Sequence, residues 1–167
     1  MTHEASVKAA CWAKGAAPLG LTHRERPVDY PLLLWTLSGL ESSHGRDRLF
    51  VRHEPGYMPG GRYYQADKWK VYGVLASSSF GSFQLMYQVA TELGFAGHPI
   101  ELQDDMTCAA WAATLIEQRI VKRQGAKTLR DVLDAYNSGS HRDGLVPAAY
   151  IKNGILLYEE GWPGETA

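Results

Sequence analysis

The residue with the clearest chemical potential is Glu41, a carboxylate near the end of an apolar stretch, residues 32–45 (LLLWTLSGLESSHG). Leu33, Leu37 and Leu40 recur at helical spacing, so this stretch predicts a helix with Glu41 in its last turn, beside the buried face. Partial burial and the negative end of the helix dipole both disfavour a charged carboxylate there. We therefore expect a raised pKa for Glu41, which suits a general acid that works near neutral pH.

Two further segments carry polar side chains next to expected helix ends. Residues 81–86 (GSFQLM) contain Gln84, whose amide offers two donors and an acceptor to a ligand. Residues 135–139 (AYNSG) contain Tyr136, whose hydroxyl could point at Glu41. Taken singly, Gln84 could equally cap its own helix and Tyr136 could be a core ring, because polar groups often bond locally.

The elements that must position these residues are mostly helices. Hydrophobic periodicity, capping residues and glycine stops predict six of them, at residues 2–14, 29–45, 81–93, 104–124, 128–138 and 147–160. The fourth is a core helix whose inward positions are Met106, Ala109, Ala113, Ile116 and Ile120. The predicted fold class is therefore mainly α, with a short loop or hairpin insertion around residues 46–76 that holds any strands.

Finer local signals support these boundaries. Asp29 can cap the helix that carries Glu41, and Gly45 can end it. Thr128 and Asp131 resemble a capping box. Residues 15–27 form a linker with turn signals that include Pro18.

Length and composition limit the function classes. With 167 residues, 45% apolar and 21% charged, the chain can form one globular domain with a sizeable core. We expect an N-terminal arm (residues 1–28) packed on a main domain (29–161) with a short tail (162–167). The net charge of −1 excludes a strongly basic nucleic-acid surface. The sequence contains no run of about 18 apolar residues, so no membrane span is predicted.

Metal and disulfide chemistry are not indicated by the spacing of the candidate residues. The six histidines show no ligand spacing, so we expect no metal and no cofactor. Cys11 and Cys108 could form a disulfide or remain buried thiols, and we favour thiols. His44 and His53 are expected at the surface.

Together and in this order, the segments ESSHG, GSFQLM and AYNSG resemble the motifs of the lytic transglycosylase family, which includes goose-type lysozymes. The family pattern is Glu-Ser after an apolar helix, then Gly-Leu-Met-Gln-Ile/Val-Met, then Ala-Tyr-Asn-Ala/Gly-Gly. The resemblance covers roughly residues 32–158, and the segment RHEP at 52–55 is most similar to phage and bacterial cell-wall lytic domains. Departures are Ser82-Phe83 for Leu-Met, Tyr87 for Pro, and a spacing of 43 residues (84 − 41) between the first two motifs.

The resemblance implies a lysozyme-like fold and a peptidoglycan-cleaving glycosidase that needs no cofactor. Glu41 would protonate the leaving oxygen and then accept the proton of the sugar's own C6 hydroxyl, so that a 1,6-anhydro product forms. Gln84 would bind the sugar's acetamido or hydroxyl groups, and the Tyr136 hydroxyl would point at Glu41 or at the acetamido group. The remaining implied site residues are Ser79, Met86, Glu54 and Asn137, although Asn137 could simply tie its helix end to the Glu41 helix.

The partner implied by the resemblance is a peptidoglycan or chito-oligosaccharide strand, bound by a monomer at the bacterial cell wall, in the periplasm or outside. The N-terminus does not have the pattern of a secretory signal. We therefore expect a phage-encoded protein, a non-classical export route or a trimmed signal.

Two alternatives remain open. A hydrolytic muramidase or chitinase of the same fold would need a second carboxylate to activate water, with Glu54 the first candidate and Asp47 the second. The other alternative is a non-catalytic wall-binding or phage structural module, against which the presence of Glu41 argues.

Overall fold

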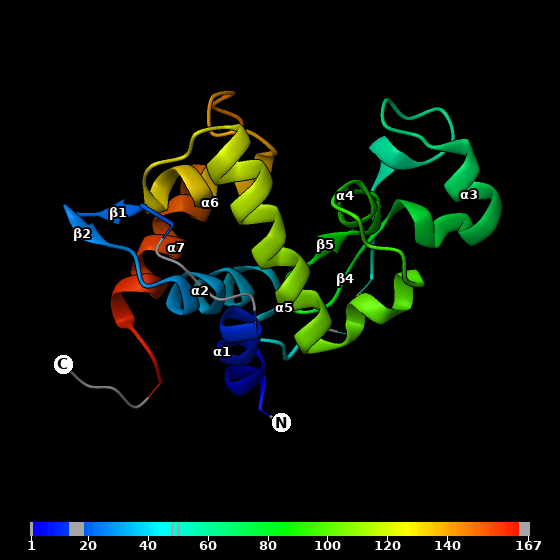
Figure 1. Ribbon diagram of the computed structural model, residues 1–167. Coiled ribbons are helices and arrows are strands. Elements are labelled where there is room, and N and C mark those ends of the chain that lie inside the picture. Colours follow the sequence, from blue (N-terminus) through cyan, green and yellow to red (C-terminus); the bar gives the residue numbers. More distant parts are fainter. Residues whose placement is uncertain (1, 14–18, 48, 50, 164–167) are drawn as a thin grey trace.

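The computed structural model describes residues 2–13, 19–47, 49 and 51–163, and these are mainly helical. A helical body contains α1, α2, α5, α6 and α7, and a small sheet with α3 and α4 extends from one side of it (Figure 1). The α-helices are α1 (His3–Ala13), α2 (Tyr30–Ser42), α3 (Ala66–Tyr72), α4 (Tyr87–Glu92), α5 (Asp105–Thr114), α6 (Leu129–Ser138) and α7 (Ala148–Glu160).

Shorter helical segments join these elements. Three are 3-10 helices: η1 (Pro55–Tyr57), η2 (Gly73–Ser77) and η3 (Pro99–Gln103). The fourth, η4 (Leu115–Arg123), is a π-helix that continues α5 without a break. The mainly α class is confirmed, and the expected core helix at residues 104–124 is an α-helix followed by a π-helix.

Two small antiparallel sheets accompany the helices. Strands β1 (Thr22–His23) and β2 (Arg26–Pro27) form a hairpin, and β3 (Arg52–His53), β4 (Ser78–Phe80) and β5 (Leu85–Met86) form a three-stranded sheet in that order. The expectation that strands occur only within residues 46–76 is therefore wrong. The predicted linker at 15–27 contains the first hairpin, and its Pro18 lies outside the described residues.

Helix α2 has the predicted capped start. The Asp29 carboxylate accepts a hydrogen bond from the Leu32 N–H at 3.1 Å, and Pro31 occupies the first turn, where its missing N–H costs nothing. The helix ends at Ser42, and its C-cap, Ser43, adopts a left-handed conformation with φ 52°, two residues before the glycine expected to stop the helix. Glu41 is thereby in the last turn, as predicted.

The segment at Gly81 is a turn between strands and not the start of a helix. Gly81 has φ 71°, and a Cβ there would lie 2.1 Å from the Leu102 carbonyl oxygen, so only glycine fits this close approach. The apolar spacing that suggested a helix from residue 81 belongs partly to β5 and partly to α4, which begins at Tyr87. Periodicity over so short a run does not distinguish a strand that leads into a helix from one continuous helix.

One hydrophobic core joins α1, α2, α5 and α6. Cys11 and Cys108 are both buried there as free thiols, and burial raises the pKa of each to about 12, so neither is a ready nucleophile. Met106, predicted to point inward, is 46% exposed because it lies in the first turn of α5. Residues 164–167 of the expected tail lie outside the described residues, whereas Trp162 is buried against Trp35.

Two further expectations are decided by burial. His44 is half-buried and stacks on Trp35 with ring centroids 4.0 Å apart, so its expected surface position is wrong; His53 is exposed as expected. The capping box of Thr128 and Asp131 is confirmed at the start of α6. Among the described residues, no helix is both long and apolar enough to cross a membrane.

Candidate active site

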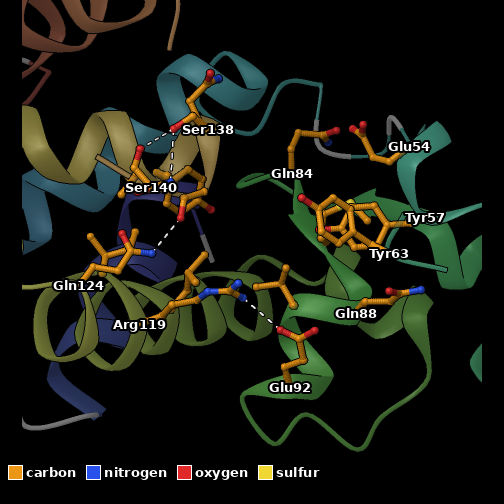
Figure 2. A pocket seen from close by; sticks show the side chains of 18 of the residues that line it. Glu54, Tyr57, Tyr63, Gln84, Gln88, Glu92, Arg119, Gln124, Ser138 and Ser140 are labelled. Carbon is orange, nitrogen blue, oxygen red and sulfur yellow. Dashed lines mark hydrogen bonds and ion pairs between the residues drawn. The ribbon is translucent and has the colours of Figure 1, made fainter. Parts of the chain in front are cut away.

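Glu41 lies at the wall of a cavity of about 600 Å³ between the helical body and the small sheet. This volume is in the range of ordinary ligand sites. Figure 2 shows Glu54, Tyr57 and Tyr63 on one side of this cavity and Gln124, Ser138 and Ser140 on the other. The cavity is therefore built from segments that are far apart in the sequence.

The Glu41 carboxylate has one direct side-chain partner that sequence reasoning missed. The Tyr150 hydroxyl donates a hydrogen bond to Glu41 Oε1 at 2.6 Å, from the first turn of α7. The two residues are separated by 109 positions in the sequence. The sequence around Tyr150 gives no signal of such a contact. Only the position of Tyr150 in the first helical turn after Pro147 could have suggested that its side chain projects from a helix end.

Close packing of α7 allows this contact. Gly154, one turn after Tyr150, is buried, and a Cβ at this position would come within 2.8 Å of Leu133 and 3.1 Å of Leu40. The absence of a side chain lets α7 lie directly on α6 and on the end of α2. The Tyr150 hydroxyl thus reaches the carboxylate because a glycine keeps the helices close.

The environment raises the pKa of Glu41, as predicted. Burial is the largest cause, because it penalises the charged form, and the nearby Glu54 carboxylate adds to it. The hydrogen bond from Tyr150 and the charge of Arg52 act in the opposite direction. The effect of burial on the pKa is the larger, so Glu41 keeps its proton to a higher pH than an exposed glutamate would. The Tyr150 hydroxyl can donate to the carboxylate once the proton has left.

Gln84 lines the cavity from the turn that joins β4 and β5. It adopts a left-handed backbone conformation, φ 44°, which is uncommon outside glycine and is found disproportionately at functional positions. Its amide oxygen accepts from the Ser79 hydroxyl at 3.2 Å, and its amide nitrogen donates to the Gly81 carbonyl at 3.1 Å. Ser79 is fully buried and positions Gln84, and it is not among the residues that line the cavity.

Tyr136 also lines the cavity, but its hydroxyl does not bond to Glu41. It donates to the Phe83 carbonyl at 2.9 Å, in the same turn that carries Gln84. The pKa of Tyr136 rises well above its usual value, first because of burial and then because of the negative charge of Glu41. A hydrogen bond from Tyr136 to Glu41, one of the two roles expected for this hydroxyl, is therefore wrong, since Tyr150 bonds to Glu41 instead. The other expected role, toward the acetamido group of a sugar, stays a prediction.

The other predicted residues divide between the cavity and the surface. Met86, Asn137 and Glu54 line the cavity together with Glu41. Glu54 is bound by Arg52, with 2.5 Å between Nε and Oε1. Asp47, the second candidate for a water-activating base, is exposed and is not among the residues that line the cavity.

Further lining groups had no sequence signal. Arg119 of η4 and Glu92 of α4 form an ion pair at 3.1 Å that spans one end of the cavity in Figure 2. Gln88 is 1% exposed, and its amide has no hydrogen-bond partner among the described residues. Within the same part of the chain, no cluster of three or more histidine, cysteine or acidic side chains could hold a metal ion.

Comparisons of the chain with known protein families, with curated proteins and with solved structures found no match. A carboxyl group with a raised pKa, a hydroxyl donor beside it and an amide on the turn between β4 and β5 can together transfer a proton to a bound polar substrate and hold that substrate in place.

Proposed function

We propose that this chain is a peptidoglycan-cleaving glycosidase with a lysozyme-like fold, a lytic transglycosylase that cuts the β-1,4 bond between N-acetylmuramic acid and N-acetylglucosamine. The observation that carries the proposal is the raised pKa of Glu41 at the wall of a ligand-sized cavity, with the Tyr150 hydroxyl 2.6 Å from its carboxylate. Its motifs also resemble those of the transglycosylase family in order and type. Such an enzyme would act at the bacterial cell wall.

In the first step, Glu41 acts as general acid. Its proton passes to the glycosidic oxygen as the bond between that oxygen and C1 breaks, so the leaving sugar departs as a neutral alcohol. Glu41 becomes a carboxylate. The hydrogen bond from Tyr150 and the charge of Arg52 favour this charged form, which offsets part of the burial penalty at the moment when the charge appears.

In the second step, the same carboxylate acts as general base. The C6 hydroxyl of the muramic sugar attacks C1 and loses its proton to Glu41, which restores the acid and leaves a 1,6-anhydro ring. The carbonyl oxygen of the sugar's own acetamido group bonds to C1 as the leaving group departs in the first step, and the C6 oxygen displaces it in this one. Gln84, which lines the cavity, would hold that sugar. No water is consumed, so one carboxyl group is sufficient.

A hydrolytic muramidase or chitinase is the second candidate, because Glu54 lines the same cavity. A water-using enzyme would need Glu54 free to accept a proton. Arg52 binds this carboxylate at 2.5 Å, an arrangement that favours a binding or loop-holding role. We expect Glu54→Gln to reduce activity only modestly, less than about tenfold, because a partly exposed ion pair contributes about 0–1 kcal/mol, and to leave the product chemistry unchanged.

The test is mass spectrometry of the products from purified peptidoglycan, with Glu41→Gln as the matched control. Anhydro ends that form with the parent chain and not with Glu41→Gln would support the proposal. Products with reducing ends only, together with a collapse of rate in Glu54→Gln as deep as in Glu41→Gln, would establish the hydrolase. Glycan binding without any cleavage would instead establish a non-catalytic wall-binding module.

A further inference from the structure

The ion pair of Arg119 and Glu92 lies in the cavity but takes no part in the proton transfers assigned to Glu41. Arg119 comes from the π-helix η4 and Glu92 from the last turn of α4, and both line the cavity. Figure 2 shows the pair facing the interior, below the side chains of Tyr57 and Tyr63. The acid–base chemistry of Glu41 therefore does not explain why an ion pair lies in this cavity.

The pair is too exposed to be a structural clamp. The Arg119 side chain is 36% exposed and that of Glu92 is 50% exposed. Ion pairs exposed to this degree contribute little to stability, because water screens the charges and two long side chains must be ordered. The guanidinium can therefore exchange one carboxylate partner for another at small cost.

The backbone nevertheless aims Arg119 into the cavity. Leu115 and Ile120 of the same π-helix line the cavity as well, so one face of η4 forms this wall. π-Helical turns are rare and occur frequently at functional sites. Arg123, one turn further on, is exposed and is not among the lining residues, which makes it a natural control.

Aromatic rings complete the surroundings of the pair. Tyr57 and Tyr63 lie with ring centroids 5.1 Å apart, and both line the cavity. The pKa of Tyr57 is raised, chiefly by burial and then by Glu92, while Arg119 acts against the rise, so this phenol lies within the field of both charges. Flat rings with a polar edge can hold the apolar face of a sugar, and the Arg119 guanidinium belongs to a residue that lines the same cavity as these rings.

We propose that Arg119 binds a carboxylate carried by a substituent of the glycan, such as the acidic peptide stem of peptidoglycan, and so selects a peptide-bearing strand over neutral chitin. This inference rests on the proposed function, because it assigns a substrate preference to the same cavity. Arg119 releases Glu92 when the ligand carboxylate binds, and Glu92 opposes the ligand both as a competitor for Arg119 and as a like charge.

The two halves of the pair should therefore have opposite effects on binding. In a Glu41→Gln background, which prevents turnover, Arg119→Gln should weaken the binding of a soluble peptide-bearing glycan fragment by about tenfold or more, the size of one charge-assisted hydrogen bond. Glu92→Gln should strengthen it. The binding of a neutral chito-oligosaccharide of equal sugar number should change by less than about twofold in both variants, because a neutral ligand exchanges no charge with the pair.

Isothermal titration calorimetry of the full chain with both glycans tests this, with Arg123→Gln as the matched control. Opposite changes for the charged glycan, and none for Arg123→Gln, support the inference. Equal losses in Arg119→Gln and Glu92→Gln, or equal affinities for the two glycans, overturn it while leaving the glycosidase proposal intact. Binding of neither glycan by any variant overturns the proposed function and this inference together, and is distinguishable from the previous result.

Discussion

Removal of the Tyr150 hydroxyl tests the electrostatic account of Glu41 most directly. In Tyr150→Phe the donor that lies 2.6 Å from Glu41 Oε1 is lost, while the ring and its packing remain. That donor favours the carboxylate, and burial, the dominant cause, disfavours it. Without the donor the pKa of Glu41 should rise further, because one of the two influences that lower it is gone.

The magnitude follows from the strength of a hydrogen bond to a charged group. Such a bond contributes about 1.5–3 kcal/mol, and 1.36 kcal/mol corresponds to one pH unit. The descending alkaline limb of kcat/KM against pH reports loss of the proton from the free enzyme's acid. In Tyr150→Phe this limb should move to higher pH by roughly one unit or more. The maximal rate should fall about tenfold or more, because the carboxylate formed in the first step loses its donor.

The assay is a pH series of initial rates on solubilised peptidoglycan, with Tyr158→Phe as control. Tyr158 lies on the same helix, and its hydroxyl accepts from the Asp29 N–H at 2.8 Å, away from the cavity. The control should leave the alkaline limb in place. An unmoved limb in Tyr150→Phe, or an equal movement in the control, would refute the claim that Tyr150 stabilises the charged form of Glu41.

Three further predictions follow from the same contacts. Glu41→Gln should reduce lytic activity by about 10²–10⁴-fold, and a retained rate above about one tenth of the parent would exclude Glu41 as the acid. Above neutral pH the variant should melt at the same or a higher temperature, because the raised pKa means that charged Glu41 lowers the stability of the folded chain as pH rises. Tyr136→Phe should lower the free energy of unfolding by about 1 kcal/mol, about 2–4 °C in Tm, and slow turnover, since its hydroxyl holds the turn at Phe83; unchanged melting would contradict that bond. Gly154→Ala should lower the free energy of unfolding by about 1 kcal/mol through overpacking against Leu133, and should shift the alkaline limb as Tyr150→Phe does. A loss of stability with an unshifted limb would show that the packing at Gly154 does not position Tyr150.

The sequence predicted the parts of the fold that local rules control. The Asp29 cap, the capping box at Thr128 and the position of Glu41 in a last turn all depend on residues within four positions of one another. The direction of the Glu41 pKa shift could be predicted as well, because its largest cause is burial, and the apolar positions around Glu41 in the sequence already indicate burial. These features need no knowledge of which helices meet.

Contacts between distant segments could not be predicted in this way. Tyr136 and Tyr150 are both tyrosines near helix ends. Of the two, Tyr150 bonds to Glu41, and it does so from a helix that packs closely against Leu133 and Leu40 at Gly154. The strand turn at Gly81 was not predicted for a related reason. Glycine is required there because the Leu102 carbonyl, which lies on another segment, leaves no room for a Cβ. The ion pair of Arg119 and Glu92 likewise joins two elements whose proximity appears only in the folded chain.

The serine that follows Glu41 connects α2 to the turn that carries Gln84. The Ser42 hydroxyl donates to the Ser82 carbonyl at 2.6 Å, across from α2 to the strand turn, and accepts from the Gly45 N–H at 2.9 Å. It is buried, so the joint is protected from competing water. This hydrogen bond holds the segment that carries Glu41 to the turn that carries Gln84, whereas Tyr57 and Tyr63 line the cavity from residues 55–65, a loop that the bond does not involve. Exchange of that loop for one of different sequence should thus redirect ligand preference while the proton-transfer geometry stays constant, so this scaffold is suited to engineering in which specificity and chemistry are varied separately.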